Sequence, residues 1–151
     1  MTQFNNMGKR FCTGAVLTAA MLLQPCIASA KSLSVGALQG SWEVTLAGTT
    51  GCGQSSFEAT FTLNPSGLAA DNMTLVTHGQ CGDSTTSDLI FEITSLNKNG
   101  SGTANLFCNA DTAICGWNLA IQVAPDGNSF SVVDVNPGNP GNFVSGMAIR
   151  Q

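Results

Sequence analysis

The sequence is poor in charged and titratable side chains, and this scarcity excludes several classes of function. Charged residues make up 9% of the 151-residue chain, which contains no tyrosine and a single histidine, His78. In an ordinary domain roughly a quarter of the residues are charged. Residues 31–151 hold three basic side chains against nine carboxylates, a formal net charge of −6. Because no cationic stripe can form, we expect neither nucleic acid nor an anionic membrane surface as a partner.

The sequence also lacks an apolar run long enough to span a bilayer, which takes about 18 residues. The apolar stretch of residues 12–23 follows two basic residues and precedes the small-residue triplet of residues 28–30. This order is typical of a Sec-type signal peptide. We therefore expect cleavage after residue 30, and a single periplasmic or secreted domain formed by residues 31–151.

Cys26 offers a second interpretation of the leader, in which the chain is anchored to a membrane by a lipid. Bacterial lipoprotein signals place a cysteine directly after an apolar residue and two small ones. Here Gln24 and Pro25 stand before the cysteine, and they fit that pattern poorly. Free release is therefore the favoured expectation, with lipid anchoring as the alternative.

Alternation of apolar and polar residues with a period of two is the dominant pattern after residue 31, and it predicts strands with one buried face. Turn-forming Asn, Pro, Gly and Asp residues separate these stretches, and none shows a sustained helical period. The chain is therefore expected to be all-β, an antiparallel meander of about eight strands. A barrel is favoured over a sandwich, because closure leaves no exposed strand edge. The expected strands cover residues 42–46, 57–63, 72–78, 88–96, 103–107, 117–123, 129–135 and 143–150.

Four cysteines follow residue 31, and an even number in an exported domain predicts two disulfides. A hairpin turning near Ser66 would bring Cys52 opposite Cys81, which lie at almost equal distances on either side. Cys108 and Cys115 likewise flank a short turn. Of three possible connectivities we therefore favour Cys52–Cys81 with Cys108–Cys115. Their spacing matches no common zinc-ligand pattern, so no metal and no cofactor is expected.

Three groups of polar residues each have a functional interpretation, either catalytic or metal-binding, and a simpler structural one. His78 with Asp83 or Asp88, on an expected loop of residues 79–87, could join a serine in nucleophilic catalysis. The simpler interpretation places His78 at the solvated end of a strand.

The carboxylates of Glu43, Glu58 and Glu92 suit glycosidase chemistry only if polar residues face the barrel interior. If the interior is apolar they point outward into solvent, which is the favoured interpretation. Asp134 and Asn136 open the Pro/Gly-rich loop Asn136–Asn142, where calcium is conceivable but ordinary turn chemistry is sufficient.

The residues Leu38-Gln39-Gly40-Ser41-Trp42 open the first expected strand, and Arg150 stands at the end of the last. This Gly-x-Trp resembles the start of calycin-type barrels, such as lipocalins, avidin-like proteins and small bacterial metalloprotease inhibitors. The resemblance implies an eight-stranded barrel in which Trp42 packs across the closed end beneath Arg150. It implies structural roles for these two residues and no ligand.

The function expected from the sequence is that of an exported, non-catalytic binding protein. One hypothesis is that the barrel holds a small apolar molecule between interior side chains. Alternatives are an inhibitor of an extracellular protease, with residues 31–37 or the Asn136–Asn142 loop as a wedge, and a surface component without a ligand. An enzyme acting through His78 is a further rival, and an oligomer is compatible with so few charges. The expected ligand-contacting residues are Phe57, Phe61, Phe91, Trp117 and Ile121.

Overall fold

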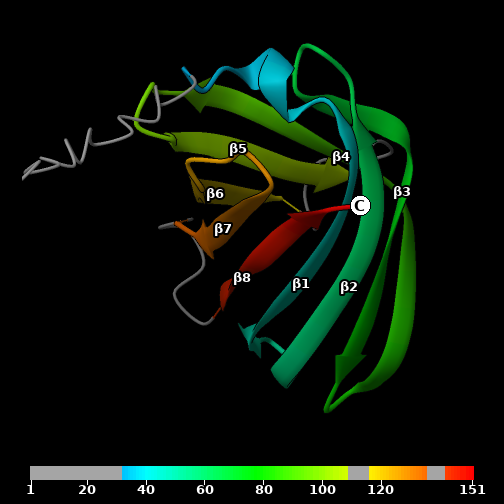
Figure 1. Cartoon of the computed structure of the whole chain (residues 1–151). Coiled ribbons are helices and arrows are strands. Elements are labelled where there is room, and N and C mark those ends of the chain that lie inside the picture. Colours follow the sequence, from blue (N-terminus) through cyan, green and yellow to red (C-terminus); the bar gives the residue numbers. More distant parts are fainter. Residues whose placement is uncertain (1–31, 109–115, 136–141) are drawn as a thin grey trace, which may run out of the picture.

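The computed structural model describes residues 32–108, 116–135 and 142–151, which form a closed, all-antiparallel β-barrel (Figure 1). Each strand pairs with its sequence neighbours, and the last strand pairs back with the first. The predicted eight-stranded meander is confirmed, as a barrel and not a sandwich, and it is consistent with a calycin-like fold. The elements are the 3-10 helix η1 (Val35–Leu38) and strands β1 (Gly40–Thr50), β2 (Gly53–Leu63), β3 (Leu68–Gly79), β4 (Gly82–Leu96), β5 (Ser101–Cys108), β6 (Trp117–Val123), β7 (Ser129–Asp134) and β8 (Phe143–Arg150).

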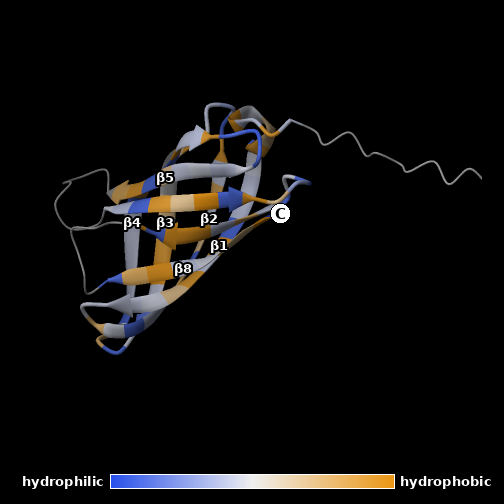
Figure 2. Ribbon diagram, turned by 90° about the vertical axis from the view of Figure 1, so that its left-hand side faces the viewer, coloured by the Kyte–Doolittle hydropathy of each residue, from blue (hydrophilic) through white to orange (hydrophobic). Residues whose placement is uncertain are grey.

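The alternating pattern places one set of side chains inside the barrel and the other set in solvent. In β1, Trp42, Val44 and Leu46 are buried while the residues between them are exposed. The same alternation of hydrophobic and hydrophilic residues follows other strands in Figure 2. The core is therefore a filled interior, formed by the inward-facing residues of the strands together with Leu38 of η1.

The hairpin of β3 and β4 is longer than the sequence pattern predicts. Residues 79–87, expected as a loop, instead contain a two-residue turn at Gln80 and Cys81 and the start of β4. The prediction was wrong here because residues 82–85 are exposed on both faces, so they carry no apolar alternation. A register shift near Met73 and the left-handed Asp88 (φ 60°) mark where the exposed part of the hairpin joins the barrel wall.

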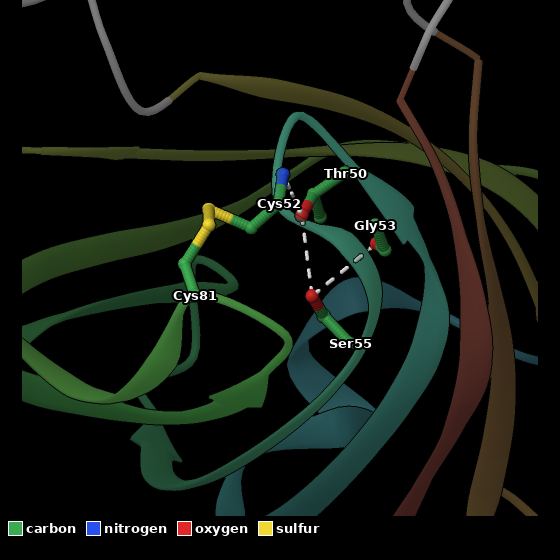
Figure 3. The surroundings of a disulfide bond; sticks show 5 residues. All are labelled: Thr50, Cys52, Gly53, Ser55 and Cys81. Atoms are coloured by element: carbon green, nitrogen blue, oxygen red, sulfur yellow. Dashed lines mark hydrogen bonds between the residues drawn. A yellow bond between two sulfur atoms is a disulfide. The ribbon is translucent and has the colours of Figure 1, made fainter.

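The barrel has two distinct ends, which we name by the features found there. At the helix end η1 lies with the turns β2–β3, β4–β5 and β6–β7, and η1 and the β2–β3 turn are uppermost in Figure 1. At the disulfide end lie the tips of the hairpins β1–β2 and β3–β4. Cys52 and Cys81 join these two tips, with their Cα atoms 5.3 Å apart (Figure 3). This predicted disulfide is confirmed, whereas the proposed partner of Cys108, Cys115, lies outside the described residues.

Trp42 and Arg150 hold η1 against the helix end of the barrel. The indole Nε1–H of Trp42 donates a hydrogen bond of 2.8 Å to the carbonyl oxygen of Leu38. The guanidinium of Arg150 donates one of 2.7 Å to the carbonyl oxygen of Ala37 and lies 5.0 Å from the centre of the Trp42 ring. The ring of Phe130 packs on Trp42 from within, at a centroid distance of 4.9 Å. The first and last strands are thereby tied to the helix that precedes them.

We expect Arg150→Ala to lower the free energy of unfolding by about 2–3 kcal/mol, because it removes a charge-assisted hydrogen bond and a cation–π contact. Arg150→Lys should recover only part of the loss, since an ammonium group cannot reproduce the planar stacking. Urea denaturation followed by tryptophan fluorescence measures both. Equal midpoints for wild type and Arg150→Ala would show that the contact contributes nothing.

The disulfide should stabilise the barrel through the unfolded chain. Its cysteines are separated by 29 residues in the sequence, and a loop of that length corresponds to about 3–4 kcal/mol in the chain-entropy treatment. We expect the double variant Cys52→Ser/Cys81→Ser to unfold at a correspondingly lower urea concentration. As the matched control, wild type and variant should coincide when both are reduced, since reduction also breaks any Cys108–Cys115 bond in each. A variant as stable as the oxidised wild type would contradict the assignment.

Candidate functional site

The interior residues expected to contact a ligand lie in the barrel core and contact other core side chains. Phe57, Phe61, Phe91 and Ile121 are buried, and Trp117 is partly buried at the disulfide end. Phe57 meets Trp117 edge to face at 5.1 Å, and Phe61 meets Phe91 at 5.0 Å between ring centres. The structure therefore joins Phe61 and Phe91 with Phe130 in an aromatic cluster and Phe57 with Trp117 in a second pair, while Ile121 belongs to the same core. Their binding of a ligand stays a prediction.

The space left between these side chains is small. The cavity recorded in the interior has a volume of about 10 Å³ and a wholly apolar lining that includes Phe61, Phe91 and Phe130. A single water molecule needs about that much room, whereas sites for small organic ligands measure roughly 300–1,000 Å³. A ligand of a few hundred daltons would thus have to displace core side chains. As described, the interior is filled by the protein itself.

A filled interior predicts a large cost for removing one aromatic ring. Phe91 packs against both Phe61 and Phe130, so we expect Phe91→Ala to lower the free energy of unfolding by about 3–5 kcal/mol. Phe143→Ala, which removes the same atoms from an exposed position, is the control and should change it by less than about 1 kcal/mol. Urea titration measures both. A small effect of Phe91→Ala would mean that the surrounding core is loosely packed.

Of the two segments expected to act as a protease wedge, the structure describes residues 32–37 of the first. Leu33 and Val35 pack against the core at the helix end, and the carbonyls of Ala37 and Leu38 accept the hydrogen bonds from Arg150 and Trp42. Leu33, Val35 and Ala37 are therefore held against the barrel, while Ser34 and Gly36 between them are exposed, and the wedge stays a prediction. Residues 136–141 of the other candidate loop lie outside the described residues.

The outer surface of β2, β1 and β8 presents a face that sequence reasoning did not single out as a site. Three large hydrophobic residues of β8 are about half exposed: Phe143 (55%), Met147 (51%) and Ile149 (52%). In Figure 2, β8 is predominantly hydrophobic in colour. We call these three residues the β8 stripe. The register aligns the outward residues of β2, β1 and β8 in four rows. From the helix end, these rows are Thr60–Glu43–Ile149, Glu58–Thr45–Met147, Ser56–Ala47–Ser145 and Gln54–Thr49–Phe143.

The carboxylates considered for glycosidase chemistry point away from the interior. Glu43 and Glu58 are exposed and line an outer cleft of about 300 Å³ together with Thr60, Thr74 and Val76. The Nε2 amide of Gln151 donates a hydrogen bond of 2.9 Å to Glu43. With an apolar interior and carboxylates outside, the inverted barrel that this chemistry requires is not formed. The two carboxylates instead give the β2–β1 side of the outer face an acidic character.

His78 lies on the outer wall, exposed on β3, beside a second and larger cleft. Its Nδ1 is 3.0 Å from Oδ1 of Asp83, which faces it directly across the β3–β4 hairpin. On its other side, the residue aligned with it is Ser56 of β2. Ser56 and His78 line this cleft of about 450 Å³, with Thr49 and Gln54. Asp88, the other carboxylate considered, lies at the irregular part of β4 and is not aligned with His78.

No metal site emerges from residues 32–108, 116–135 and 142–151, which contain no group of three or more His, Cys, Asp or Glu side chains able to hold an ion. Asp134 is buried at the end of β7, and the rest of the calcium candidate falls mostly on residues outside the described ranges. Within the same part of the chain, no helix is long and apolar enough to cross a membrane. The observed disulfide is consistent with an extracytoplasmic protein.

No protein-family model matches the sequence, and no curated protein matches it. Its function must therefore be argued from the barrel and its surface.

Proposed function

We propose that this chain is an exported binding protein that recognises another extracellular protein with the outer face of β8, β1 and β2. The observation that carries the proposal is the β8 stripe, in which Phe143, Met147 and Ile149 are each about half exposed on one face of one strand. A contiguous patch of large apolar side chains on a protein surface marks an interaction site, whereas single exposed apolar residues are ordinary. Aromatic residues and methionine are also enriched in protein interfaces.

The charges beside the stripe indicate the kind of partner. Glu43 lies directly opposite Ile149, and Glu58 follows one strand further away in the row of Met147. Thr45, the one residue between Met147 and Glu58 in that row, is uncharged, whereas Glu43 adjoins the stripe directly. A protein that presents apolar side chains next to a lysine or arginine would match this face in both polarity and charge.

Two alternatives receive less support. A small apolar ligand inside the barrel requires the aromatic cluster to open, since the recorded cavity is about 10 Å³. A protease inhibitor that inserts residues 31–37 would have to release Leu33 and Val35 from the helix end. An inhibitor that docks with the β8 stripe is a special case of the proposal, with a protease as the extracellular partner.

We expect Met147→Arg to weaken partner binding at least tenfold, because it places a charge in the middle of the apolar stripe. The experiment incubates immobilised wild type and variant with the extracellular proteins of the host and quantifies each retained protein. Thr85→Arg adds the same charge on an exposed part of β4 and is the matched control. The proposal expects one protein to be retained by wild type and Thr85→Arg and lost with Met147→Arg.

The same experiment can overturn the proposal in two ways. Retention of the same proteins in equal amounts by wild type and Met147→Arg would show that the β8 stripe takes no part in partner binding. A wild type that is dimeric in sedimentation, and monomeric with Met147→Arg, would show that the stripe pairs two copies of this chain. That result would overturn the proposal that the stripe binds a different protein.

A further inference from the structure

Ser56, His78 and Asp83 form one row across three neighbouring strands of the outer wall. The register aligns Ser56 of β2 with His78 of β3, and His78 with Asp83 of β4. Residues aligned in an antiparallel pair project their side chains to the same face, with Cβ atoms about 4.5–5.5 Å apart. The order serine, histidine, aspartate therefore arises from strand pairing, although Ser56 lies 22 residues before His78 in the sequence.

The observed hydrogen-bonding distance fixes how the imidazole is oriented. Because Nδ1 of His78 lies 3.0 Å from the Asp83 carboxylate, the proton of the neutral ring is held on Nδ1. The lone pair is then on Nε2, on the side of the ring remote from Asp83. An imidazole oriented in this way takes a proton from a serine hydroxyl when substrate binding brings the two groups within hydrogen-bonding distance, with the aspartate as a positioning residue.

The cleft beside this row has room for a substrate and contains a hydrogen-bond donor for the carbonyl oxygen of that substrate. The cleft has a volume of about 450 Å³, and both Ser56 and His78 line it. Gln54, two residues before Ser56 on the same face of β2, lines it as well. Its side-chain amide can donate a hydrogen bond to a developing oxyanion. The other outward side chains of the lining are uncharged, namely Ala47 and Thr49, which suits a neutral substrate.

We propose that Ser56, His78 and Asp83 form an acyl-transfer site that hydrolyses small uncharged esters. The Ser56 oxygen adds to the ester carbonyl as His78 Nε2 takes its proton. The carbon–oxygen bond to the leaving alcohol then breaks, and the alcohol departs with that proton. Water hydrolyses the resulting serine ester by the reverse proton path, which releases the acid and restores the serine. No oxidant, metal or cofactor is consumed.

The exposure of the row sets the kind of activity to look for. The side chains of His78 and Asp83 are 51% and 74% exposed, so water screens the charges that develop in the transition state. Such a site favours activated esters with good leaving groups over peptides. Ser56 also belongs to the outward rows of β2 beside the β8 stripe, but the stripe itself contributes no group to the row, so this inference does not rest on the proposed protein-binding function.

The test combines hydrolysis of p-nitrophenyl acetate with labelling by a fluorophosphonate, followed by peptide mass spectrometry. We expect wild type to be labelled on Ser56, and Ser56→Ala to lose the label and at least about tenfold of the hydrolytic rate. His78→Ala should lose both as well. Asp83→Asn should lower the labelling rate, and Asp83→Glu, which keeps a carboxylate, should recover part of it. Ser87→Ala, an exposed serine of the same hairpin, is the control and should match wild type.

Three results would overturn the inference. They are label on another residue, a rate for Ser56→Ala equal to that of wild type, and loss of hydrolysis in His78→Ala alone, which would make the imidazole itself the nucleophile. All the substituted side chains are outside the core, and thermal melting of each variant verifies that the barrel is intact. Because binding to the partner is measured separately, failure here leaves the β8 proposal standing.

Discussion

The pairing of β8 with β1 is the constraint on which the rest of the structure depends. Eight aligned residue pairs, from Trp42 with Arg150 to Thr49 with Phe143, close the ladder. The two strands approach so closely that a Cβ atom added to Gly146 would collide with the backbone of Thr45 and Leu46. Closure removes the free edges that would otherwise pair with other chains. It also fixes the volume that the inward side chains must fill.

How that volume is filled decides where function can reside. The inward set includes several aromatic rings in mutual contact, so the interior resembles a packed core more than a ligand chamber. Recognition then depends mainly on outward side chains, since each strand of the closed wall pairs with a neighbour on either side. Because this chain carries few charges, its outer wall is made mostly of hydroxyl and amide groups. The β8 stripe and the row of Ser56, His78 and Asp83 differ from that background.

Sequence alternation predicted the barrel well and its surface sites poorly, for a physical reason. Trp42, Val44 and Leu46 alternate with polar residues because one face of a barrel strand meets the core and the other meets water. In β8 three of the four outward positions, Phe143, Met147 and Ile149, are also apolar, and this departure from alternation was the one signal that could have revealed the stripe. Asp83 was one of two carboxylates predicted beside His78, but the alignment of Ser56 with His78 could not be predicted, since it depends on the register of β2 against β3. The extended β3–β4 hairpin was missed because both of its faces are polar.

Native mass spectrometry of the protein purified from its own host tests the central claim, that the barrel is filled by its own side chains, most directly. The account predicts that every charge state carries the mass of the processed chain alone, or of a whole-number multiple of it. A non-covalent adduct of a few hundred daltons, present in the native spectrum and lost on denaturation, would contradict the claim. It would mean that the aromatic cluster around Phe61 and Phe91 opens to hold a ligand, and the adduct mass would begin its identification.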